Sequence, residues 1–128
     1  FYGVSGAVAL RSPSLALKYA LKSFRLEENS KIMISALASD WQYSAIEELG
    51  YEPLILDVSA SSGLVEIEKI QQGILDGGRV LLYHETCGLL PNMEELLELI
   101  QQERHNNFYL IKKLKNLKSC CLPSSSFF

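Results

Sequence analysis

Three things are scarce in this sequence, and each limits the kind of protein it can be: cysteines, net charge and long apolar runs. The 128 residues carry a net charge of −3, which is too small to indicate a nucleic acid or a membrane surface as partner. No apolar run approaches the roughly 20 residues that cross a bilayer, so we expect no membrane helix. The opening residues have no basic lead and no cleavage site, so we expect no secretory leader.

The three cysteines, Cys87, Cys120 and Cys121, form neither a metal-binding spacing nor a Cys-x-x-Cys motif. An odd set of this kind is typical of reduced thiols, which indicate a cytoplasmic protein. The sequence also has no Walker loop, no Gly-x-Gly-x-x-Gly after a strand, no Gly-x-Ser-x-Gly and no His-Glu-x-x-His. We therefore predict no metal site and assign no catalytic residue.

The sequence does contain a regular alternation of short apolar runs and amphipathic stretches. With 48% hydrophobic and 21% charged residues, its composition is that of a globular protein. Short apolar runs predict buried strands, and apolar positions at steps of three and four predict helices. The helix over 12–24 has Leu17, Ala20, Leu21 and Phe24 on one face. The predicted strands cover 6–11, 31–35, 52–58, 79–84 and 107–111, and the predicted helices cover 12–24, 39–50, 64–75 and 93–104.

Alternating strands and helices imply parallel strands that are joined by crossover helices. The predicted fold class is therefore α/β, a doubly wound, mostly parallel five-stranded sheet with helices on both faces. This domain is expected to span residues 1–111, after which the alternation stops. Residues 112–128 are rich in Lys, Cys and Ser and are predicted to be an irregular tail of the kind left by a frameshift or a truncation. A natural flexible or membrane-touching tail is the alternative.

The first strand-to-helix turn is the most informative place for a ligand, because ligands of open parallel sheets bind beyond the carboxyl ends of the strands. Ser12 is a good helix N-cap, and Pro13 fits the first helical position, where no N–H is needed. The free backbone N–H groups of Ser14 and Leu15 would attract a phosphate, together with the helix dipole and two serine hydroxyls. The turn therefore predicts either a phosphate site or a serine that only caps the helix.

The order of the motifs resembles that of one enzyme family. The segment AVALRSPSLALKYAL (7–21) is similar to the region around the Ser-Gly-Thr phosphate cup of the DegT/DnrJ/EryC1/StrS aminotransferases. Ser12, Pro13 and Ser14 fall on the three positions of that cup. Two later segments continue the resemblance in register. Their matching residues are Ala45, Ile46, Gly50, Pro53, Asp57 and Val58 within 31–58, and His84, Gly88 and Met93 within 67–100.

This resemblance implies a fold-type I enzyme that uses pyridoxal 5′-phosphate (PLP) and aminates nucleotide-linked keto sugars, normally as a homodimer. Ser12, Ser14 and Leu15 would bind the cofactor phosphate. Trp41 or Tyr43 would substitute for the aromatic residue that stacks on the pyridine ring, with a packing role on the helix surface as the alternative. The nucleotide-linked sugar would be the substrate.

The sequence departs from the family at several positions that matter for catalysis. The family's stacking aromatic residue aligns with Ser39, and the phosphate cup is altered at two of its three positions. Lys112 and Lys113 stand where the family has a Glu-Asp pair, whose Asp keeps the pyridinium nitrogen protonated. None of the tail lysines matches the lysine that bonds the cofactor. The chain is therefore expected to be a fragment that catalyses no transamination by itself.

Two non-enzymatic alternatives remain open. Asp57 lies at the end of the third predicted strand, Thr86 follows the fourth and Lys112 follows the fifth, as in a phosphoacceptor receiver domain. Such a domain also needs an acidic pair after its first strand to hold a divalent metal, and Arg11 and Ser12 stand there instead. Without that role, Asp57 is expected to cap the following loop. The other alternative is an interaction or dimerisation module with exposed apolar surface.

Overall fold

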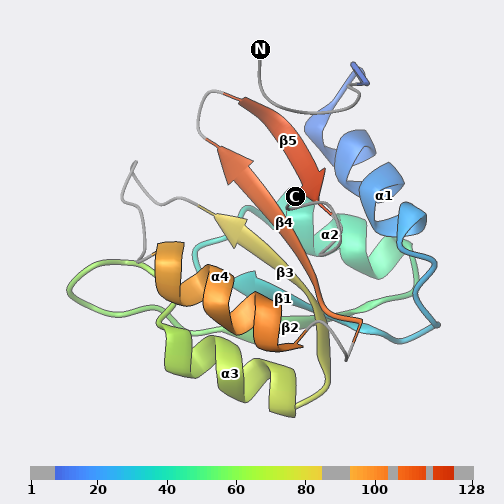
Figure 1. Cartoon of the computed structure of the whole chain (residues 1–128). Helices are drawn as coiled ribbons and strands as arrows, with labels where there is room; N and C mark the ends of the chain where they lie inside the picture. Colours follow the sequence, from blue (N-terminus) through green and yellow to red (C-terminus); the bar gives the residue numbers. More distant parts are fainter. Residues whose placement is uncertain (1–7, 85–92, 104–106, 115–116, 123–128) are drawn as a thin grey trace.

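The computed structural model describes residues 8–84, 93–103, 107–114 and 117–122 of the chain. Helices and strands alternate through these residues, and two strands follow the last helix (Figure 1). The elements are α1 (Pro13–Ser23), β1 (Lys31–Ser35), α2 (Asp40–Glu48), β2 (Glu52–Leu56), α3 (Ile67–Leu75), β3 (Gly78–His84), α4 (Met93–Gln102), β4 (Tyr109–Leu114) and β5 (Leu117–Leu122).

The strands form a five-stranded sheet in the order β2-β1-β3-β4-β5. β1 to β4 run parallel, and β5 pairs with β4 in the antiparallel direction. The chain first moves from β1 to β2 and then returns past β1 to β3, so the direction of winding reverses between β1 and β3. Such a reversal point is the usual ligand site of doubly wound sheets. The predicted α/β class and its parallel strands are confirmed for β1 to β4.

The remaining strand is not the predicted one. The strand expected over 6–11 is wrong where the structure describes it, because Val8, Ala9 and Leu10 have no strand conformation and are exposed. Residues 6–7 lie outside the described residues. An apolar run becomes a strand only when its backbone reaches an unpaired sheet edge, and the edge of β4 is already paired with β5. The fifth strand lies instead in the segment that was expected to be irregular.

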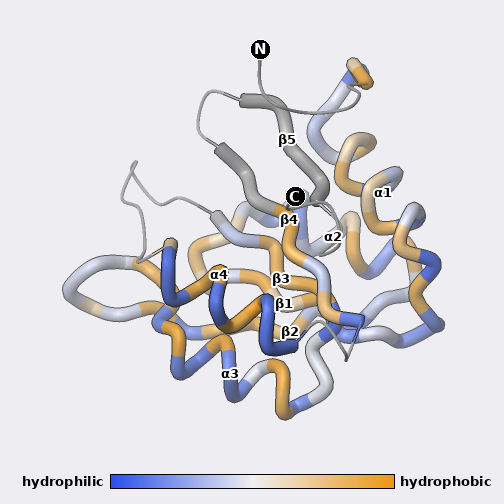
Figure 2. The backbone as a smooth tube through the Cα atoms, viewed as in Figure 1, coloured by the Kyte–Doolittle hydropathy of each residue, from blue (hydrophilic) through white to orange (hydrophobic). Residues whose placement is uncertain are grey.

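Helices cover both faces of the sheet, and each face has its own hydrophobic core (Figure 1). Successive strand residues point to opposite faces, so Ile32 and Ile34 contact one core and Met33 the other. Figure 2 shows hydrophobic residues along the central strands and on the inner sides of the helices. The core under α1 and α2 contains Leu17, Ala20, Leu21, Ile32, Ile34, Ala45, Ile46, Val80, Leu82 and Ile111. The core under α3 and α4 contains Met33, Leu56, Val65, Ile70, Leu81, Tyr83, Leu96, Leu99, Ile100, Phe108 and Leu110.

The predicted inner face of α1 is confirmed. Leu17, Ala20 and Leu21 are buried, and the half-buried Phe24 stacks on Tyr109 with the ring centroids 4.3 Å apart. This contact joins the end of α1 to the start of β4. Within the described part of the chain, no helix is long and apolar enough to cross a membrane.

Candidate functional site

The first turn of α1 lies beside the ends of the parallel strands. α1 runs in the opposite direction to β4, so the helix begins at the side of the sheet where β4 ends (Figure 1). The partial positive charge of the helix N-terminus therefore lies near the carboxyl ends of the strands, where doubly wound sheets bind ligands. This placement agrees with the position expected for a phosphate-binding turn.

Ser12 caps α1 as predicted. Its backbone is extended, with φ −143° and ψ 154°, and its Oγ accepts a hydrogen bond from the Leu15 N–H at 3.2 Å. Its carbonyl oxygen accepts the first helical hydrogen bond, from the Ala16 N–H at 3.1 Å. Pro13 occupies the first helical position, where its missing N–H is not needed. These residue types at this spacing explain why the helix begins here.

The cap changes what the turn offers to an anion. The expectation of an unpaired Leu15 N–H is wrong, because the Ser12 hydroxyl already accepts its hydrogen bond. The N–H of Ser14 has no hydrogen-bond partner among the described residues, and the Ser14 side chain is half-buried. The first turn contains no acidic residue, and the side chain of Arg11 next to it is exposed. With respect to the described part of the chain, the turn therefore retains one free N–H, two hydroxyls and an electrostatic environment that favours an anion.

Trp41 lies in the first turn of α2 and packs against the core under α1 and α2. Its indole is half-buried, and its backbone N–H donates a hydrogen bond to Asp40 Oδ1 at 2.8 Å. The side chain thus has a packing role, which sequence reasoning had weighed against ring stacking. Stacking of Trp41 on a pyridine ring stays a prediction.

The turn between β1 and α2 contains two buried polar residues. Ser35 begins the stretch 35–41, which the sequence places at the carboxyl end of a strand, and Gln42 is a residue that sequence reasoning missed. Ser35 Oγ accepts a hydrogen bond from the Leu37 N–H at 3.1 Å, and Gln42 Oε1 accepts one from the Ser39 N–H at 3.2 Å. Both bonds fix the backbone where the winding of the sheet reverses. A glutamine three residues after a serine N-cap is the signature of a capping box, so the sequence held a signal for Gln42.

The turn after β2 shows a structural role for Asp57. Its Oδ1 accepts a hydrogen bond from the Val58 N–H at 2.9 Å, so the expectation that Asp57 caps this loop is confirmed. No group of three or more His, Cys, Asp or Glu that could hold a metal ion occurs in the described residues. Thr86 lies outside those residues. Nothing at Asp57 therefore favours the receiver alternative.

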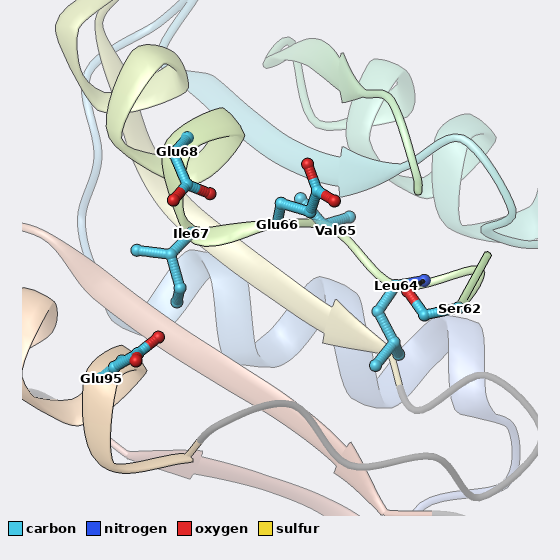
Figure 3. Close-up of a pocket in the computed structure, with 7 residues that line it drawn as sticks. All are labelled: Ser62, Leu64, Val65, Glu66, Ile67, Glu68 and Glu95. Carbon is cyan, nitrogen blue, oxygen red and sulfur yellow. Dashed lines mark hydrogen bonds between the residues drawn. The ribbon is translucent and has the colours of Figure 1, made fainter. Parts of the chain in front are cut away.

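A pocket of about 270 Å³ also lies on the side of the carboxyl ends of the strands, between the start of α3 and the first turn of α4 (Figure 3). Three of its seven lining residues are acidic, namely Glu66, Glu68 and Glu95. Glu68 and Glu95 lie on either side of Ile67 in this view. Because carboxylates repel a phosphate, this pocket is a poor site for the anion expected at α1.

The last parallel strand continues through the two lysines that replace the family's acidic pair. Lys112 and Lys113 belong to β4, where they are paired in register with Tyr83 and His84 of β3. The backbone at these positions is therefore part of the sheet. Gly88, which carries part of the family resemblance, lies outside the described residues.

Comparison with known proteins agrees with this geometry. A model of the DegT/DnrJ/EryC1/StrS aminotransferase family matches residues 1–111. Among solved structures, Spr1654 from Streptococcus pneumoniae in its PMP form is 16% identical with a TM-score of 0.71, over 80% of this chain and 29% of that one. The aminotransferase from Psychrobacter cryohalolentis is 20% identical with a TM-score of 0.67, over 78% of this chain and 25% of that one.

A third similar structure is the E. coli GDP-4-keto-6-deoxy-D-mannose-3-dehydratase with bound hydrated PLP. It is 18% identical with a TM-score of 0.66, over 80% of this chain and 27% of that one. At these identities the likeness to solved structures shows the fold. The chain spans less than a third of the length of each of the three proteins.

Proposed function

Because the chain belongs to the DegT/DnrJ/EryC1/StrS aminotransferase family, we propose that the first turn of α1 binds the phosphate of PLP. Ser14 would donate from its free N–H and its hydroxyl, and Ser12 and Leu15 would complete the turn. The chain would thus supply part of the cofactor site of an enzyme that acts on nucleotide-linked sugars, with homodimerisation as part of the same proposal.

The N–H of Ser14, which has no hydrogen-bond partner among the described residues, is the observation that carries this proposal. It stands at the start of a helix with no acidic residue in its first turn, where the helix dipole favours an anion. The Leu15 side chain is 38% exposed, so the turn is open to solvent and to a ligand. The hydroxyl of Ser12 can also donate a hydrogen bond to a phosphate oxygen while its lone pair accepts from Leu15.

The residues present do not fit the pyridine ring as well as they fit the phosphate. Trp41 and Tyr43 are aromatic side chains near the family's stacking position, and the indole of Trp41 is partly buried against the core, which reduces the ring surface that a ligand could contact. The carboxylate that would keep the ring nitrogen protonated is replaced by Lys112 and Lys113. A lysine has no carboxylate that could keep the ring nitrogen protonated, so we derive no catalytic step and propose that the 128-residue chain alone is inactive.

Binding of PLP to the purified chain tests the phosphate site. Ser14→Asp places a carboxylate at the turn, and repulsion of the phosphate is expected to weaken PLP binding about tenfold, or about 1.4 kcal/mol. Ser44→Asp is the matched control, because Ser44 is exposed on α2 and its substitution should leave binding unchanged. Equal binding of PLP by both variants would contradict the assignment. Pyridoxal, which lacks the phosphate, is expected to bind neither the wild-type chain nor the variants.

Borohydride reduction followed by mass spectrometry tests the proposed inactivity. Borohydride fixes PLP covalently where a lysine has bonded to its aldehyde carbon. We expect weak labelling spread over several exposed lysines and no transamination of a donor amino acid. One stoichiometric adduct on a single lysine would overturn the proposed inactivity and leave the phosphate site standing.

A further inference from the structure

The strand β5 lies outside the part of the chain that matches the family, and yet it completes the sheet. The family match ends at residue 111, whereas β5 covers Leu117–Leu122. Its backbone pairs with β4, with Leu110 opposite Leu122, Ile111 opposite Cys121 and Lys112 opposite Cys120. The residues beyond the family match therefore cover one edge of the sheet with main-chain hydrogen bonds.

Without β5, the β4 edge would be open to other strands. An unpaired edge presents a row of N–H and C=O groups that can pair with another chain. The first part of β4 is apolar and buried, with Leu110 only 3% exposed and Ile111 only 4% exposed. Lys112 and Lys113 discourage pairing only at the other end of the strand. An apolar edge of this kind favours strand pairing between copies.

The opposite edge of the sheet differs from the β4 edge. β2 has five residues and begins with Glu52 followed by Pro53. A short strand with a charge and a proline is a poor template for pairing, since proline has no N–H to donate. The sequence of β2 therefore limits pairing at its own edge, whereas the edge of β4 depends on β5.

β5 also contacts the helix that carries the candidate phosphate site. The backbone of α1 lies close to the backbones of α2 and β5, and Figure 1 shows β5 between β4 and α1. We propose that β5 is an intrachain edge strand with two effects: it closes the β4 edge to strands of other copies, and it holds α1 on the sheet. This proposal does not depend on cofactor binding.

Disulfide formation in the full chain tests the pairing, because the chain already has cysteines in β5. Residues opposite each other in an antiparallel pair lie on the same face at a Cα separation that a disulfide can span. Lys112→Cys is therefore expected to bond with Cys120 in a chain that also carries Cys121→Ser and Cys87→Ser. Oxidised glutathione takes up the two electrons and becomes reduced glutathione.

The matched control carries Lys112→Cys, Cys87→Ser and Cys120→Ser, so that Cys121 is the cysteine that remains in β5. Neighbouring residues of a strand point to opposite faces, so this pair should not bond. We expect the first variant to lose both free thiols as a monomer, with a mass lower by two hydrogen atoms. The control should form no intrachain disulfide, so that its two cysteines stay thiols or carry one glutathione each, which mass spectrometry distinguishes. Failure of both variants, equal bonding in both, or a disulfide between two copies would each overturn the intrachain pairing.

Two further measurements on the full chain test the two effects. The N–H groups of consecutive strand residues point alternately toward the two neighbouring strand positions. Of the two substitutions Cys120→Pro and Cys121→Pro, one therefore removes an N–H that faces β4, and the other removes an N–H that faces away from β4. We expect one of these variants to form larger assemblies than the wild-type chain in sizing chromatography, and the other to match it. In the oxidised Lys112→Cys variant, α1 amides should exchange more slowly with deuterium than in its reduced form. Identical elution of all three chains would overturn the first effect, and unchanged exchange in α1 would overturn the second.

Discussion

Gly73 in α3 is the position where the structure makes the sharpest prediction about stability. A Cβ atom built on Gly73 would lie 2.4 Å from Met33 Sδ and 3.0 Å from Leu56 Cδ2. Met33 is 0% exposed and Leu56 is 6% exposed, so neither side chain can move into solvent. Glycine at this position lets α3 pack directly on β1 and β2.

Gly73→Ala is therefore expected to lower the free energy of unfolding. Replacing a helical glycine by alanine gains about 1 kcal/mol of helix propensity, while overpacking a full core costs about 1–3 kcal/mol. Because a contact of 2.4 Å is far below van der Waals distance, we expect the upper end of that cost. The net loss is then about 2 kcal/mol, to be measured by urea unfolding followed by circular dichroism.

Two comparisons separate overpacking from a general effect of substitution in α3. Gln71→Ala changes an exposed residue of the same helix and should alter stability by less than about 0.5 kcal/mol. Met33→Ala removes the obstructing sulfur, so the double variant with Gly73→Ala should lose about 1–2 kcal/mol less than the sum of the single losses. A Gly73→Ala chain as stable as the wild type would refute the packing argument.

Two further predictions concern α1 and α2. Ser12→Ala removes the oxygen that accepts from the Leu15 N–H, so the free energy of unfolding should fall by about 1 kcal/mol; an unchanged urea midpoint would show that this cap contributes nothing. A hydrogen bond to the carboxylate of Glu47, helped by its negative charge, raises the pKa of Tyr43 above its ordinary value. Glu47→Ala should therefore lower the pKa of Tyr43 in an ultraviolet titration in which Tyr43→Phe identifies the signal; a pKa that stays raised would contradict this cause.

The elements with strong local patterns could be predicted from the sequence. The face of α1 followed from steps of three and four, and the Ser-Pro pair fixed where the helix begins. The same steps predict Met93, Leu96, Leu97 and Ile100 as the inner face of the helix over 93–104. Leu96 and Ile100 are buried as predicted, but Leu99 is buried in place of Leu97, which is only half-buried. Both leucines lie near the border of the apolar stripe, so the exact helix orientation, which depends on neighbours, decides between them.

Strand pairing at the edges could not be predicted, because it depends on residues far apart in the chain. Val8 to Leu10 are as apolar as a buried strand, yet they lie outside the sheet and are exposed. β5 contains a lysine, a serine and two cysteines and gave no strand signal, yet its backbone pairs with β4. A strand forms where an edge is available, and residue type is a weak guide to that.

The candidate site was predicted in part for a similar reason. The spacing of Ser12 and Pro13 predicted a helix start beside the sheet, which the structure has. The same spacing could not decide whether the Ser12 hydroxyl accepts a hydrogen bond from the Leu15 N–H or leaves that N–H free for a ligand. A helix cap and a phosphate-binding turn need the same residue types at these positions. The structure has the hydrogen bond, which leaves the Ser14 N–H as the group on which the phosphate proposal depends.

The most direct test of the central claim is the backbone amide resonance of Ser14 in a ¹⁵N-labelled chain titrated with PLP. We expect a saturable shift of the Ser14 resonance, smaller shifts for its neighbours in the first turn of α1, and no such shift with pyridoxal. A Ser14 resonance that stays in place while other amides of the chain respond to PLP would contradict the claim that this turn binds the cofactor phosphate.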